Sequence, residues 1–74
     1  MEIRIGVQNV PREVVLESSE TAADVGAAVA AALRGGSPLT LKDERGRTVI
    51  VPAEAIAFVE LGAEEARRVG FGAL

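Results

Sequence analysis

Residues 2–8 alternate between apolar and polar side chains, which is the period of a strand buried on one face. Residues 13–17 are expected to form a second strand, and a turn-forming Asn-Val-Pro-Arg stretch separates the two. The inward positions are Ile3, Ile5 and Val7 in the first strand and Val14 and Leu16 in the second. Gly6 leaves a gap on the outer face, where we expect a bulge or the close approach of another backbone.

A helical period follows, from about Ala22 to Arg34. Thr21, with Asp24 three residues later, resembles a capping box, and Gly35-Gly36 suits the left-handed conformation that ends a helix. The stripe expected to face the core recurs at helical spacing. It consists of Ala22, Val25, Val29, Ala32 and Leu33.

The opposite side of this helix is smooth and nearly uncharged. It carries Ala23, Ala27, Ala30 and Ala31. Alanine is the best helix former, so helix propensity alone accounts for these residues. The alternative is a close-packing face for a second helix, in a dimer or a partner protein.

Residues 39–61 predict three more strands in meander order. Alternation over 39–42 and β-branched residues over 47–51 flank Asp-Glu-Arg-Gly, which has the chemistry of a hairpin loop. Pro52 lacks the N–H that strand pairing needs and ends the second of these strands. After a short turn or loop, extended chain resumes over residues 56–61.

The predicted order β-β-α-β-β-β favours a two-layer α+β fold, with one helix packed on a mostly antiparallel sheet. This order is also that of a β-grasp fold, which would set the first and last strands side by side and parallel. A small SH3-like barrel with a helical insert is the alternative. We expect residues 1–62 to form a single domain and residues 63–74 a C-terminal tail, either flexible or docked on a partner.

Composition narrows the chemistry. The 74 residues include no cysteine and no histidine, so disulfides, thiolate metal sites and the usual neutral-pH acid and base are missing. A formal charge of −3 argues against general nucleic-acid binding. The chain has no signal-peptide pattern and no apolar run that could span a membrane, so we expect a cytoplasmic protein.

No phosphate-binding loop occurs, because Gly35-Gly36-Ser37 follows a helix whereas such loops precede one. The sequence predicts no cofactor, no metal and no catalytic residue, and hence a protein that is not an enzyme. Arg45 and Arg47 flank the hairpin turn and are candidates for binding an anion. The alternative is that they are scattered solubilising charges.

The tail combines charge with apolar residues that a solvated segment does not need. Its candidate partner-binding residues are Arg67, Arg68, Val69 and Phe71. These residues either fold back on the domain or insert into a partner.

Three stretches resemble the DUF3107 family of small actinobacterial proteins: MEIRIGVQNVPREVVLES, LTLKDERGRTVIVPAEAIAFVELG and RRVGFG. The resemblance covers nearly the whole chain and implies a short cytoplasmic protein of uncharacterised function. Some relatives carry an ATP-binding label, which no phosphate-binding motif in this sequence supports.

The missing catalytic residue types and the apolar tail favour a noncatalytic protein-interaction or regulatory module with an unknown protein partner. It would act through a sheet edge, the alanine face or the tail. The alternatives are a sensor of a small anionic ligand or nucleotide, and a homodimeric scaffold.

Overall fold

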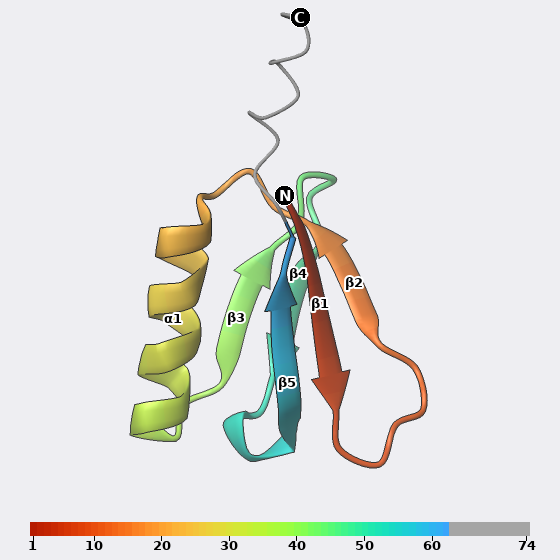
Figure 1. Ribbon diagram of the computed structural model, residues 1–74, viewed down its shortest axis with the longest axis vertical. Coiled ribbons are helices and arrows are strands. Elements are labelled where there is room, and N and C mark those ends of the chain that lie inside the picture. Colours follow the sequence, from red (N-terminus) through yellow and green to blue (C-terminus); the bar gives the residue numbers. More distant parts are fainter. Residues whose placement is uncertain (63–74) are drawn as a thin grey trace, which may run out of the picture.

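The computed structural model describes residues 1–62, and its elements follow the predicted order (Figure 1). They are β1 (Glu2–Val7), β2 (Val14–Glu17), α1 (Ala22–Gly35), β3 (Leu39–Lys42), β4 (Thr48–Val51), the short 3-10 helix η1 (Ala53–Ala55) and β5 (Ile56–Leu61). One helix packs against antiparallel strands, which confirms the α+β class.

The strands form two sheets rather than the one expected. A three-stranded sheet has the order β2-β1-β5, and β3 and β4 form a separate hairpin. Every pairing is antiparallel. The hairpin lies behind the three-stranded sheet, and α1 flanks both (Figure 1).

Two predictions about the last strand are wrong. β5 does not extend a meander from β4, and although it lies beside β1, it runs antiparallel to it. The cause is the turn at η1, where the N–H of Ala55 donates to the carbonyl of Pro52 at 3.0 Å. The N–H of Gln8 then donates to the carbonyl of Ala55 at 2.8 Å. Because β5 begins where β1 ends, it returns along β1 in the opposite direction.

The expected irregularity at Gly6 is present. The register between β1 and β5 shifts between Gly6 and Val7, as a bulge requires. Gly6 lies opposite Phe58, whose aromatic ring covers it: a Cβ built on Gly6 would fall 2.1 Å from Cε2 of that ring. Of the two predicted alternatives the bulge is therefore present, and the gap on the outer face is filled by the Phe58 side chain rather than by another backbone.

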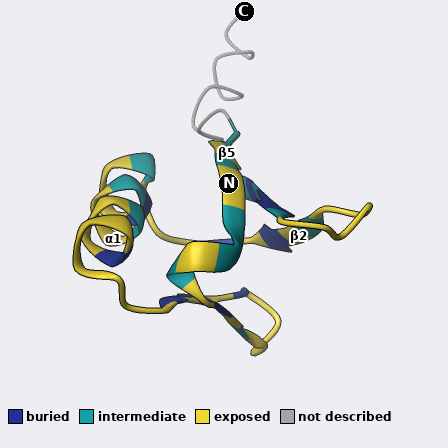
Figure 2. Ribbon diagram, turned by 90° about the horizontal axis from the view of Figure 1, so that it is seen from below, coloured by how far each residue is buried: buried dark blue, intermediate teal, exposed yellow. Residues whose placement is uncertain are grey.

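The core lies between the helix, the hairpin and the inner face of the three-stranded sheet, where the buried positions converge (Figure 2). Its best-buried large side chains are Ile3, Ile5, Leu16, Val25 and Leu39. Val14 is half-buried, so both inward positions predicted for the second strand are confirmed. The first strand supplies much of this core, in keeping with its strict alternation.

Helix α1 begins and ends as predicted. The Thr21 hydroxyl accepts from the N–H of Asp24 at 3.1 Å, and Gly36 is left-handed, with φ of 72°. Val25 and Ala32 are buried and Val29 is half-buried, but Leu33 is 52% exposed. Leu33 follows Val25 by eight residues, which turns it about 80° away at about 100° per residue. The prediction that Leu33 faces the core is wrong.

Candidate interaction surface

The turn between β3 and β4 is held by its own backbone. The N–H of Asp43 donates to the carbonyl of Arg47 at 2.8 Å, and the N–H of Gly46 to the carbonyl of Asp43 at 2.9 Å. Gly46 has φ of 93°, a left-handed conformation that glycine adopts without strain. The loop chemistry predicted for residues 43–46 is thereby confirmed.

The Asp43 carboxylate lies at the centre of this turn, with its side chain only 3% exposed. It accepts from the N–H of Arg45 at 2.7 Å, from Nη2 of Arg47 at 3.0 Å and from the N–H of Glu17 at 3.2 Å. The Arg45 hydrogen bond and then the Arg47 guanidinium lower the pKa of Asp43 from 3.8 to about 2, against the opposing effect of desolvation. Asp43 is therefore a structural anion, ionised at neutral pH.

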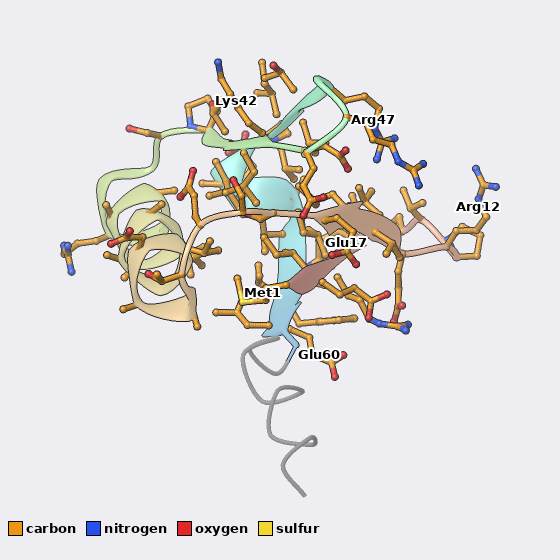
Figure 3. The ribbon with its side chains drawn as sticks, turned by 90° about the horizontal axis from the view of Figure 1, so that it is seen from above. Met1, Arg12, Glu17, Lys42, Arg47 and Glu60 are labelled. Carbon is orange, nitrogen blue, oxygen red and sulfur yellow. The ribbon has the colours of Figure 1, made fainter. Side chains whose placement is uncertain are left out.

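This arrangement bears on the predicted anion site. Arg47 already pairs with Asp43 and extends toward β2, where its Nη2 lies 3.4 Å from the carbonyl oxygen of Val15. Arg12 lies on the same side of the molecule as Arg47 (Figure 3). An incoming anion would compete with the buried carboxylate for Arg47, so anion binding by Arg45 and Arg47 stays a prediction without geometric support.

The same turn covers the outer edge of β2. Besides the Glu17 N–H bonded to Asp43, the carbonyl of Glu17 accepts from the N–H of Glu44 at 2.8 Å. The carbonyl of Val15 faces Arg47. Three backbone groups that an edge strand would otherwise offer to a new strand are thus already engaged. This edge is a poor candidate for the sheet-edge interaction considered above.

The outer face of the three-stranded sheet presents a different surface. Strand register places Val15, Arg4 and Glu60 in one row across the sheet, and Gly6 and Phe58 in the next. Arg4 donates to Oε1 of Glu13 at 3.1 Å and lies 3.4 Å from Oε1 of Glu2. The hydrogen bond to Glu13, reinforced by the charge of Glu2, raises the pKa of Arg4 above its ordinary value.

We call this surface the acidic face. It consists of Glu2, Arg4, Glu13, Val15, Glu17, Phe58 and Glu60. Its four carboxylates and one guanidinium sum to −3, the formal net charge of the whole chain. Two large apolar side chains are exposed among them, Val15 by 43% and Phe58 by 45%. Glu60 points away from the β3–β4 hairpin (Figure 3).

Sequence reasoning did not find the acidic face. One signal was present at Val15, an apolar residue between the inward positions Val14 and Leu16. Phe58 gave no such signal, because residues 56–61 are almost all apolar. Alternation alone says which residues of one strand share a side. It does not say that β5 lies beside β1, and so it could not bring Phe58 and Glu60 next to Arg4.

The other predicted surfaces fare differently. Ala23, Ala27, Ala30 and Ala31 are all exposed, so the alanine face is free within the described chain, although nothing shows what would cover it. Arg67, Arg68, Val69 and Phe71 lie outside the described residues.

Other kinds of site are not found in residues 1–62. No pocket is present there, and no cluster of acidic side chains is arranged to hold a metal ion. Every buried side-chain nitrogen or oxygen in this range has a hydrogen-bond partner. The helices within it fall short of the length and apolarity that a membrane crossing requires.

Comparison with known proteins identifies the family. No curated protein matches the chain. A family model described as "Protein of unknown function (DUF3107)" matches residues 1–72, nearly all of the 74 residues. The chain therefore belongs to the DUF3107 family.

Proposed function

We propose that this protein is a noncatalytic interaction module that binds a partner protein through the acidic face. The observation that carries the proposal is the exposure of Phe58 and Val15, by 45% and 43%, on an otherwise well-formed sheet. Aromatic side chains are favoured at the centre of protein interfaces, and charged side chains at the rim. The acidic face has both.

The outer surface of the sheet is ordered in a way that suits this role. The Phe58 ring lies on Gly6, so its position is determined before a partner arrives. Arg4 is likewise oriented by Glu2 and Glu13. A surface that is ordered in advance loses less conformational entropy on binding.

Site-specific crosslinking in cells of the source organism tests the proposal. A photoreactive phenylalanine analogue replaces Val15 in the full-length chain, and a matched control carries it at Ile50, which is 62% exposed on the β3–β4 hairpin. We expect a crosslinked partner from position 15 and none from position 50. The substitution Phe58→Ala should abolish that adduct.

Two outcomes would contradict the proposal. Equal crosslinking from both positions would show that exposure, rather than the acidic face, decides the contact. An adduct made solely of two copies of this chain would favour the homodimeric scaffold instead.

A further inference from the structure

The acidic face contains one carboxylate that has no counter-charge. Glu2 and Glu13 share Arg4, and Oε1 of Glu17 lies 3.5 Å from the amino group of Met1. The Glu60 carboxylate makes no hydrogen bond or ion pair with any residue of the described chain. Strand register places Glu60 directly opposite Arg4, but the Arg4 guanidinium is turned toward the other two glutamates. Glu60 is therefore left open to an external cation.

The exposed aromatic ring lies beside this carboxylate. Phe58 and Glu60 are two residues apart on β5, so they point to the same side and are separated by about 7 Å along the strand. One side of the Phe58 ring covers Gly6, and the side chain is still 45% exposed. An aromatic face next to a free carboxylate is a combination that recognises a flat cation.

From this geometry, and resting on the proposed function, we infer that the partner presents an arginine to the acidic face. Its guanidinium pairs with the Glu60 carboxylate and lies against the Phe58 ring. Arginine fits better than lysine because its planar guanidinium can bind a carboxylate through two N–H groups and also stack on an aromatic ring. The four carboxylates of this face outnumber its two cations, Arg4 and the Met1 amino group, which supports a basic segment around that arginine.

Titration of the full-length chain with synthetic peptides tests this inference. The probe is a short peptide of alternating arginine and glycine, and matched peptides carry lysine or glutamate in place of arginine. Binding is followed by amide chemical shifts of the isotope-labelled protein. We expect the arginine peptide to shift the amides of Val15, Phe58 and Glu60, and the lysine peptide to bind at least about threefold more weakly.

Variants identify the contact. Glu60→Gln and Phe58→Leu should each weaken binding of the arginine peptide by roughly fivefold, which corresponds to about 1 kcal/mol. Glu54→Gln is the control, because Glu54 is an exposed carboxylate on η1, away from the acidic face. The inference is wrong if Glu60→Gln binds as tightly as the unaltered chain, if shifts map elsewhere, or if millimolar arginine peptide produces none.

These results separate the inference from the proposed function. If the partner still crosslinks to position 15 in the Glu60→Gln variant, the proposed interaction module is supported and the arginine contact is rejected. A second arm tests the chain's own arginines with the double variant Arg67→Ala, Arg68→Ala. In the absence of peptide, the Phe58 and Glu60 amides of this double variant are compared with those of the unaltered chain. If these amides are shifted and the variant binds the peptide more tightly, the chain's own arginines bind the acidic face, and the inference of a partner's arginine is overturned.

Discussion

The carboxylate of Asp43 accepts a hydrogen bond from the main-chain N–H of Glu17 at 3.2 Å, across 26 positions of sequence. Asp43 belongs to the β3–β4 turn and Glu17 to the end of β2, so this contact ties the two sheets together. The bond between the N–H of Glu44 and the carbonyl of Glu17 lies beside it. The Asp43 side chain, which stabilises the β3–β4 turn, thus also positions one sheet against the other.

This contact predicts a pH dependence of stability. Folding holds the pKa of Asp43 at about 2, below its ordinary 3.8, so the unfolded chain takes up this proton first as the pH falls. The stabilisation is therefore complete well above pH 3.8 and is lost as the pH falls through about 2. Asp43→Asn should lower the melting temperature by several degrees near neutral pH, and the difference from the unaltered chain should shrink in acid. Thermal unfolding from about pH 6 to about pH 2 measures both.

Glu44→Gln is the matched control for Asp43. Glu44 is in the same turn and is exposed, and it contributes its backbone N–H rather than its carboxylate. The Glu44→Gln variant should therefore lose the same stability on acidification as the unaltered chain. A constant difference between Asp43→Asn and the unaltered chain across the whole pH range would contradict the role assigned to the Asp43 carboxylate.

The contact between Gly6 and Phe58 predicts strong coupling. In Gly6→Ala the new methyl group would overlap the Phe58 ring, so the ring must move, and we expect a loss of roughly 1–3 kcal/mol in the free energy of unfolding. When Phe58→Ala has removed the ring, the same Gly6→Ala change should instead stabilise the strand by about 0.5–1 kcal/mol. Urea unfolding of the two single variants and the double variant completes the cycle. Additive effects would show that the ring does not depend on the glycine.

Gly26 offers a contrast within the helix. It lies inside α1, and a Cβ built on it meets nothing within 4 Å. Gly26→Ala should therefore stabilise the protein by about 1 kcal/mol through helix propensity alone. Chemical denaturation monitored by circular dichroism measures this gain. If Gly26→Ala destabilises the protein instead, the surface of α1 at Gly26 must already contact another group, which the added methyl group would displace.

The helix cap gives a fourth prediction. Thr21→Ala removes the hydroxyl that accepts from the N–H of Asp24, and should cost about 1 kcal/mol of stability. Thr21→Ser keeps a hydroxyl oxygen at the same position and should retain most of this stabilisation. If both variants lose the same stability, the methyl group of Thr21 rather than its hydroxyl matters.

The local structure of this protein could be predicted from its sequence, and the pairing of its strands could not. Alternation identified the inward Ile3, Ile5 and Leu16, and capping chemistry identified both ends of α1. These signals act over a few residues. The position of β5 depends on where the turn at η1 directs the chain, which no period in residues 56–61 encodes.

The candidate surface shows the same division. Arg45 and Arg47 stood out because they flank a turn, yet Arg47 is occupied by Asp43. Phe58 and Glu60 were not identified as site residues. A phenylalanine in a strand is expected to be buried in the core until the pairing of that strand shows which face it is on. Only the pairing of β5 with β1 sets the ring on Gly6 and leaves Glu60 beside it.

The closure of the outer edge of β2 has a consequence for how copies of this protein behave at high concentration. Polymerisation into fibrils needs a row of unengaged amide and carbonyl groups as a template for the next chain. At β2 the groups of Glu17 are already bonded to Asp43 and Glu44. Growth of a fibril from that end would first require the β3–β4 turn to detach, so the turn gives a short chain protection against self-templated aggregation there.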